Sequence, residues 1–230
     1  MFANFDFDVI RRALPYLFLD GMTFTLTLTA LSAIGGLTFG TLIALMRLSG
    51  LKVLGRIAGL YVDFMRSLPL VLVIFWFYFL VPFIGQWVTG ASQPIQVGAF
   101  VSSLVTFTLF EAAYFAEIMR AGIQSIPRGQ VGAAQALGMR YLQVMGYIVL
   151  PQAFRNMLPV LLTQTIVLFQ DTSLVYVLSI TDFLGAASKV AQRDGRLVEM
   201  YLFAALVYFV ISFVASLLVR RLQRRIAIIR

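Results

Sequence analysis

A short polar run interrupts a long apolar segment in the C-terminal half of the chain. It consists of Gln170, Asp171, Thr172 and Ser173, between LTQTIVLF and LVYVLSI. An isolated carboxylate deep in a bilayer costs about 2.5–3.5 kcal/mol by insertion scales, so Asp171 should face protein or a water-filled cavity. Asp171, Thr172 and Ser173 also favour helix N-caps, which predicts two half-helices separated by a break with exposed backbone N–H groups. Such a break could bind a zwitterion, with Asp171 taking the ammonium group; the alternative is that Asp171 only caps the break.

Three further side chains could contribute to a polar site of this kind. Arg66 could complement a carboxylate bidentately, although Asp63 lies three residues earlier and could instead pair with it on one helix face. Glu111 lies inside another apolar run, and Tyr114, three residues later, shares its helix face. The candidate residues of a polar site are therefore Gln170, Asp171, Thr172, Ser173, Glu111, Tyr114 and Arg66.

The residue types that are missing limit the chemistry. The chain has no His and no Cys, which excludes His-based metal sites, Ser–His and Cys–His pairs, and disulfides. We therefore expect no metal and no catalytic site, with carboxylate chemistry in a membrane enzyme as the remaining enzymatic alternative. There is no GxxxxGK[ST] segment, so ATP bound in that mode is not expected in this chain. We also expect no cofactor. Glu117 and Arg120 are expected to form an ion pair at a helix end.

Membrane-spanning helices are the elements that must position these groups. The chain is 60% hydrophobic and 12% charged, which is more apolar surface than a soluble domain of 230 residues could bury. Its net charge of +8 does not indicate nucleic-acid binding, because the basic residues flank apolar runs. We expect a single all-α membrane domain, 1–230, with five spans at about 21–46, 60–87, 97–119, 156–180 and 198–219.

The Lys and Arg residues predict the orientation of these spans. The loops after the first and third spans and the C-terminal tail are basic, whereas the loop at 88–96 has no charge. This pattern places the N-terminus outside and the C-terminus in the cytoplasm. Residues 1–20 resemble an interfacial amphipathic lead-in more than a cleaved signal. Gly36 and Gly40 form a GxxxG pattern, which favours close helix contact, most simply within the chain.

The loop between the third and fourth spans contains an unusual segment, 127–151, rich in small residues. Pro127 can begin a helix, and Pro151 is expected to break the helical ladder before the next span. Gly132 and Gly138 leave bare surface that another protein could approach closely. One face should be buried, formed by Leu142, Met145, Ile148 and Val149. Physical reasoning alone favours equally a docking helix and an amphipathic connector that lies on the membrane.

This segment resembles the EAA loop of the permeases of bacterial ATP-binding-cassette importers, whose pattern is roughly E-A-A, then G, then I-x-L-P. The matching residues are Ala133, Ala134, Gly138, Ile148, Leu150 and Pro151, while Gly132 stands where the family has Glu. The resemblance implies a cytoplasmic coupling helix that sits in a groove of an ATPase subunit. Its contact residues would be Gly129, Gly132, Ala133, Ala134, Ala136, Leu137 and Gly138. Because Gly132 has no side chain, it cannot make any polar contact that the family's Glu makes. The helix itself is still expected.

The motifs RSLPL, FEAAYFAEIMRAGIQSIPRGQ and FQDTSLVYVLS extend the resemblance over nearly the whole chain, to permeases of the polar amino-acid subfamily. FEAAY, LFQDTSLVYVLS and QRDG are most similar to the permease subunits of glutamate/aspartate importers. The resemblance implies a non-catalytic, multi-pass subunit of a bacterial inner membrane, in which the polar candidates would line the path of an acidic amino acid. Its implied partners are an ATPase dimer that binds ATP, a second permease (a related chain or a second copy) and a periplasmic substrate-binding protein. The alternatives are another polar amino acid in the same importer class, or an ion-coupled secondary carrier, against which the lack of a detectable inverted repeat counts.

Overall fold

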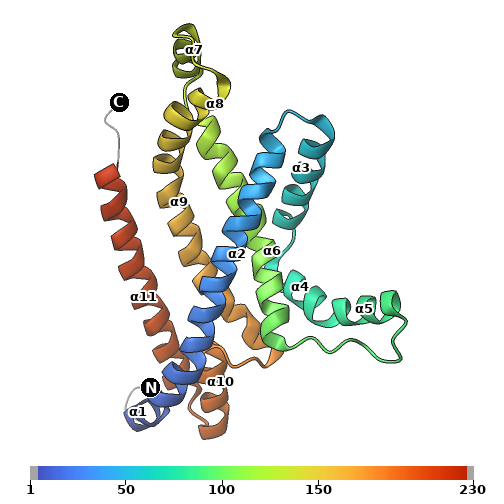
Figure 1. The fold of residues 1–230 in the computed structure, drawn as a ribbon. Helices are drawn as coiled ribbons and strands as arrows, with labels where there is room; N and C mark the ends of the chain where they lie inside the picture. Colours follow the sequence, from blue (N-terminus) through green and yellow to red (C-terminus); the bar gives the residue numbers. More distant parts are fainter. Residues whose placement is uncertain (1–4, 227–230) are drawn as a thin grey trace.

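The computed structural model describes residues 5–226, and all regular structure in that range is helical (Figure 1). The first four residues of the predicted lead-in and Arg230 of the basic tail lie outside the described residues. In chain order the α-helices are α1 (Phe7–Pro15), α2 (Thr23–Leu48), α3 (Lys52–Arg66), α4 (Leu70–Phe75), α5 (Val81–Thr89), α6 (Ala99–Gln124), α7 (Arg128–Ala136), α8 (Tyr141–Val144), α9 (Leu150–Asp171), α10 (Phe183–Asp194) and α11 (Leu197–Ile226). Single π-helical stretches join α1 to α2, α4 to α5 and α8 to α9, at Tyr16–Met22, Trp76–Leu80 and Met145–Val149. A 3-10 helix, Thr172–Leu178, continues α9.

Within the described residues, five helical stretches are long and apolar enough to cross a membrane, which confirms the predicted number. They are Phe7–Leu48, Leu70–Thr89, Ala99–Gln124, Tyr141–Leu178 and Leu197–Ile226. The described part of the lead-in is the helical start of the first stretch, where the side chain of Asp6 accepts hydrogen bonds from the backbone of Asp8 and Val9. The apolar face of this lead-in packs against α10 and α11, so part of it contacts protein.

The second span begins at Leu70, later than predicted. Helix α3 ends at Arg66 because Ser67 closes its last turn: the Ser67 N–H and Oγ both donate to the Asp63 carbonyl, at 3.1 and 2.6 Å. Pro69, which has no backbone N–H, then takes an extended conformation before α4 begins. Arg66 therefore ends a separate helix and does not lie inside a span. Figure 1 shows this helix, α3, folded back beside α2.

The fourth span is longer than predicted and unbroken. Pro151 does not interrupt it: it lies at the start of α9, directly after the π-helical turn Met145–Val149, and the backbone stays helical on both sides. The chain also stays helical through the polar run, and Asp171 makes no side-chain cap there. The prediction of two half-helices with open N–H groups is therefore wrong. Leu168 and Val175, on either side of the run, are both fully buried in the core, so continuous packing outweighs the local preference for a cap.

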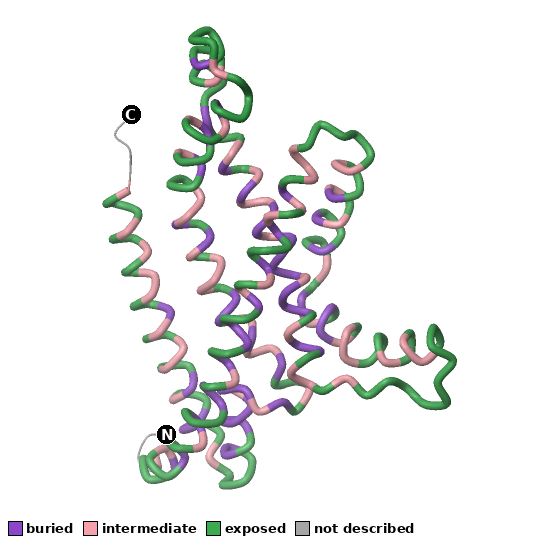
Figure 2. Tube along the Cα trace, in the orientation of Figure 1, coloured by how far each residue is buried: buried purple, intermediate pink, exposed green. Residues whose placement is uncertain are grey.

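Glycines allow α2 and α6 to pack closely. A Cβ atom added to Gly36 would lie 2.9 Å from the Cβ of Glu111, and one added to Gly40 would lie 2.8 Å from the Cβ of Phe115. The GxxxG pattern thus serves a contact within the chain, as predicted. Figure 2 shows buried residues concentrated along α6 where α2 crosses it, and where α1, α10 and the adjacent end of α11 meet.

Candidate functional site

Polar side chains from α3, α6 and α9 form a cluster that consists of Arg66, Glu111, Tyr114, Gln164 and Asp171. The Cζ atom of Arg66 lies 5.4 Å from the centre of the Tyr114 ring, a cation–π distance. Glu111 is fully buried, and its two carboxylate oxygens accept hydrogen bonds from Gln164 Nε2 at 3.3 and 3.2 Å. Asp171 lies close enough to interact electrostatically with Glu111 and Tyr114. This polar cluster offers an exposed guanidinium group and a half-buried carboxylate to a ligand.

Helix α3 is fixed against α6, which places Arg66 over Tyr114. The Tyr61 hydroxyl donates to the carbonyl oxygen of Leu109 at 2.5 Å, and Val62 is fully buried. The alternative ion pair between Asp63 and Arg66 is absent within the described residues, where the guanidinium group of Arg66 lies over the Tyr114 ring. Arg66 therefore has no carboxylate partner at ion-pair distance in residues 5–226.

The remaining residues of the polar run have other contacts. Gln170 donates from Nε2 to Ser212 Oγ on α11 at 3.1 Å, which joins α9 to α11. Thr172 is fully buried, and its hydroxyl donates to the Phe169 carbonyl of its own helix at 2.8 Å. Ser173 is half-buried. The structure thus brings Asp171 to the polar cluster, whereas Gln170 bonds to α11 and Thr172 bonds to the preceding turn of its own helical stretch.

Sequence reasoning missed two partners of the predicted residues. Glu117 and Arg120 form the expected ion pair, with Arg120 Nε 3.1 Å from Glu117 Oε2, but Arg47 also bonds to Glu117 at 2.5 Å. Gln164, the hydrogen-bond partner of Glu111, is the second missed residue. Both contacts join residues more than fifty positions apart, so no local spacing in the sequence indicates them. The only available signal is that polar side chains within apolar spans need partners.

The segment predicted to couple to another protein projects beyond α9 at one end of the molecule (Figure 1). Helix α7 begins after Pro127, as predicted, and Gly138 follows it with φ +81°. Leu137 is 84% exposed, although it is apolar. Cβ atoms added at Gly129 or Gly132 would meet nothing within 4 Å. Ala133 and Ala136 are exposed as well, so α7 presents a smooth surface of small residues around one exposed leucine.

The face that anchors this segment differs from the predicted one. Leu142 was expected to be buried and is 81% exposed, whereas Val149 is buried as expected, together with Val144, Ala134 and Ala153. The reason is the π-helical turn Met145–Val149, whose i to i+5 bonding brings positions five residues apart onto one face. Met145 and Ile148 pack against this cluster and are half-buried. Ala134 therefore holds α7 to its own chain.

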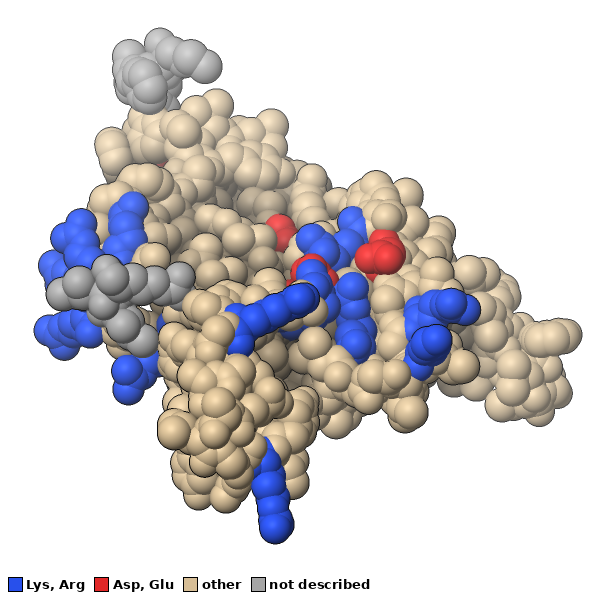
Figure 3. Space-filling view, turned by 90° about the horizontal axis from the view of Figure 1, so that it is seen from above, with Lys and Arg blue, Asp and Glu red and all other residues tan. Residues whose placement is uncertain are grey.

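Basic side chains gather at the end of the molecule that carries α7. Figure 3 looks onto this end and shows many Lys and Arg side chains beside few acidic ones. They come from the end of α2, the start of α3, the ends of α6 and α11, and α7 (Arg47, Lys52, Arg120, Arg128, Arg224 and Arg225). In residues 5–226 no group of three or more acidic side chains that could hold a metal ion is found.

Comparisons with known proteins agree over most of the chain. A family described as "Binding-protein-dependent transport system inner membrane component" matches residues 36–228. The glutamate/aspartate import permease protein GltK of Escherichia coli O6:H1 is 55% identical over 224 residues, which cover 97% of this chain and 99% of that protein. The probable glutamine ABC transporter permease protein GlnP of Bacillus subtilis is 34% identical, over 90% of this chain and 92% of its own length.

Solved structures share the fold. The crystal structure of an amino acid ABC transporter with histidines matches with a TM-score of 0.86 and 33% identity, covering 96% of this chain and 98% of that one. The MetNI methionine ABC transporter in an inward-facing conformation matches with a TM-score of 0.71 and 20% identity, over 93% and 97% of the two chains.

Proposed function

From the premise that this chain belongs to the family of binding-protein-dependent transport system inner membrane components, and is a permease subunit of an ATP-binding-cassette importer, we propose that it carries glutamate and aspartate. The observation that supports this substrate class most strongly is the 55% identity to a glutamate/aspartate import permease over nearly the full length of both proteins. The probable glutamine permease is 34% identical, so another polar amino acid in the same importer class is the second candidate.

The substrate path runs along the polar cluster in this proposal. Arg66 is exposed and lacks a carboxylate partner within the described residues, so its guanidinium group can bind the side-chain carboxylate of an acidic amino acid. The carboxylate of Asp171 can bind the substrate ammonium group. Glu111 and Tyr114 position these two groups, because Glu111 is bonded to α9 and the Tyr114 ring lies under Arg66.

The other residues of the polar run form the wall of the path. Gln170 joins α9 to α11, and Thr172 bonds within its own helix, so both hold the backbone beside Asp171. Ser173 extends this wall by one position. Because the helix is not open here, substrate contacts come from side chains and not from free backbone N–H groups.

The segment around α7 is the docking surface for a cytoplasmic ATPase. Its contact residues are Gly129, Gly132, Ala133, Ala136, Leu137 and Gly138, while Ala134, which is buried, holds α7 to its own chain beneath them. The exposed Leu137 and the open glycines support this role, because an apolar anchor among small residues fits a groove in a partner. The ATPase binds and hydrolyses ATP, and its different contacts with α7 in each nucleotide state bias the permease between outward-facing and inward-facing conformations. The permease itself is not catalytic and holds no cofactor.

The basic end of the molecule faces the cytoplasm in this assembly. The gathering of Lys and Arg around α7 supports that orientation, with the N-terminus outside and the C-terminus inside a bacterial inner membrane (Figure 3). Two permease subunits, this chain with a related chain or a second copy, stand on two ATPase subunits. A periplasmic binding protein delivers the substrate to the opposite end.

Hydrolysis of ATP by the reconstituted assembly tests this function. The chain, its neighbouring-gene ATPase and second permease are placed in lipid nanodiscs, and the binding protein is added empty or loaded with glutamate, aspartate or glutamine. We expect stimulation by the protein loaded with glutamate or aspartate above that by the empty protein. Stimulation with glutamine alone would move the substrate to the second candidate. No stimulation by any loaded form, in a complex that contains every subunit, would contradict the proposed importer.

A further inference from the structure

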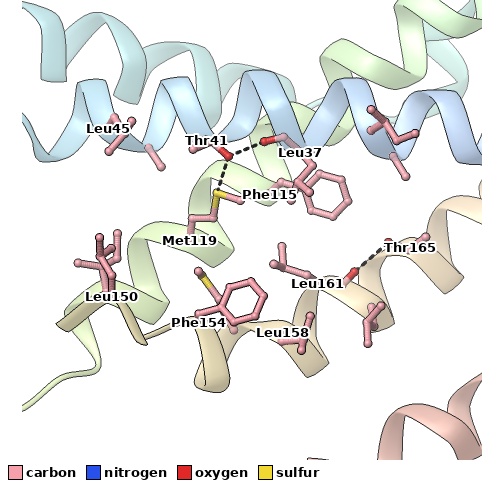
Figure 4. Close-up of a pocket in the computed structure, with 16 residues that line it drawn as sticks. Leu37, Thr41, Leu45, Phe115, Met119, Leu150, Phe154, Leu158, Leu161 and Thr165 are labelled. Carbon is pink, nitrogen blue, oxygen red and sulfur yellow. Dashed lines mark hydrogen bonds between the residues drawn. The ribbon is translucent and has the colours of Figure 1, made fainter. Parts of the chain in front are cut away.

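Helices α2, α6 and α9 enclose an apolar groove that the polar cluster does not use (Figure 4). Its volume is about 550 Å³, and its only hydroxyl-bearing residues within the described chain are Thr41 and Thr165. Both hydroxyls are already bonded to their own helices: Thr41 donates to the Leu37 carbonyl at 2.6 Å, and Thr165 to the Leu161 carbonyl at 3.0 Å. Because the lining is otherwise apolar and both hydroxyl protons are already used, a polar ligand would find no free side-chain donor there, and the groove suits hydrocarbon.

The groove is longer than one leaflet of a bilayer is deep. It follows α9 from Leu150 to Thr165, a distance of roughly 22 Å at about 1.5 Å per residue. The hydrocarbon of one leaflet is about 15 Å deep, half of the roughly 30 Å core. The lining residues all lie in stretches that are able to cross a membrane. The groove is therefore long enough to hold an acyl chain along most of its length.

A cation flanks the groove near the end that carries α7. Arg155 follows Phe154, which lines the groove, and lies about 100° around α9 from it. Arg155 is exposed, and none of the ion pairs within residues 5–226 includes it. Basic side chains beside clefts between membrane helices favour anionic lipid headgroups. An apolar helix of a partner subunit would supply no anionic group to pair with this guanidinium group.

We propose that this groove binds an acyl chain of an anionic phospholipid, and that Arg155 binds the phosphate of its headgroup. The inference goes beyond the proposed import function, and it depends on neither the substrate nor the ATPase contact. The bound lipid would fill the space between α2 and α9 at the end of the molecule where α7 is anchored.

Photocrosslinking in the assembled transporter tests the proposal. A benzophenone amino acid is placed at Phe154, which is 53% exposed, and the importer is reconstituted with known fractions of phosphatidylglycerol and phosphatidylethanolamine. The same amino acid at Leu206 of α11, which is 58% exposed and does not line the groove, reports the bulk lipid. Mass spectrometry then identifies every crosslinked product.

We expect phosphatidylglycerol adducts at position 154 to be enriched about fivefold over phosphatidylglycerol adducts at position 206. This ratio corresponds to the attraction of about 1 kcal/mol between one basic residue and anionic lipid. Arg155→Gln should return the ratio at position 154 to the bulk value. Arg56→Gln, which removes an exposed arginine of α3 outside the groove lining, should leave the enrichment unchanged. Equal adduct ratios at the two positions would overturn the proposal, and so would a permease subunit as the main product at position 154.

Discussion

Substitution of Gly36 by alanine probes how closely α2 must approach the polar cluster. A Cβ atom at this position would lie 2.9 Å from the Cβ of Glu111 and 3.2 Å from two ring atoms of Phe115. Neither neighbour can turn away, because the first is fixed to the α6 backbone and the second belongs to a buried ring that is 1% exposed. Gly36→Ala should therefore force α6 away from α2 at the level of Glu111.

The cost of this substitution can be separated from the general benefit of alanine in a helix. Overpacking a dense core costs about 1–3 kcal/mol, whereas replacing a helical glycine by alanine contributes roughly 0.5–1 kcal/mol of stability. Gly59→Ala is the matched control, since a Cβ atom on that glycine of α3 would meet nothing within 4 Å. The two variants should thus differ by about 1–3 kcal/mol in the free energy of unfolding.

Thermal unfolding of the purified chain in detergent measures this difference. At about 2–4 °C per kcal/mol for a chain of this size, Gly36→Ala should unfold roughly 2–12 °C below Gly59→Ala. Gly36→Ala should also lower transport at equal amounts of assembled importer, because Glu111 shifts relative to Gln164. Equal unfolding temperatures of the two variants would refute the close packing of α2 and α6 on which the site depends.

Three further predictions concern the docking surface, the substrate path and a buried cap. Leu137→Asp should reduce co-purification of the ATPase at least tenfold in a pull-down, since an exposed apolar anchor becomes charged. Val53→Asp on α3, where the valine is 73% exposed, is the control and should leave the recovery of the ATPase unchanged. Asp171→Asn and Arg66→Lys should each lower substrate uptake about tenfold or more at unchanged subunit composition, since each weakens a charged or bidentate contact. Burial raises the pKa of Asp182 to about 7. The contribution of this carboxyl group to stability is therefore present below its ordinary pKa near 4 and is lost as the pH rises through 7. Asp182→Asn should flatten the dependence of the unfolding temperature on pH between these two values.

Each of these predictions has an outcome that contradicts it. Normal ATPase recovery with Leu137→Asp would remove α7 from the docking surface. Wild-type uptake with Asp171→Asn would leave that carboxylate a role in structure only. An unchanged pH slope in Asp182→Asn would mean that another group titrates there, despite the hydrogen bonds that Asp182 accepts from Leu184 and Gly185.

The spans could be predicted from the sequence, but their ends and internal geometry could not. Apolar length alone indicates five crossings, because the bilayer requires it. The start of the second span was misplaced because the apolar residues of α3 run on into α4, with only the Ser67 turn and the extended Pro69 between them. The fourth span stays helical through Asp171 because buried residues on both sides favour continuous packing over an N-cap.

The candidate site was predictable only in part, for a similar reason. The polar residue types within the apolar runs identified Arg66, Glu111 and Asp171. Their partners come from distant parts of the chain: the ring of Tyr114 lies under Arg66, and Gln164 of α9 bonds to Glu111. Spacing along one helix predicts neighbours on that helix, whereas contacts between helices depend on crossing geometry, which the sequence does not show.

Uptake of radiolabelled glutamate into vesicles tests the central claim most directly. The vesicles contain this chain with its neighbouring-gene ATPase and second permease, ATP on the side of α7, and the binding protein on the other. We expect accumulation of glutamate that is competed by unlabelled aspartate and that requires both ATP and the binding protein. Accumulation that persists without ATP and without the binding protein, or its complete absence in a fully assembled complex, would contradict it.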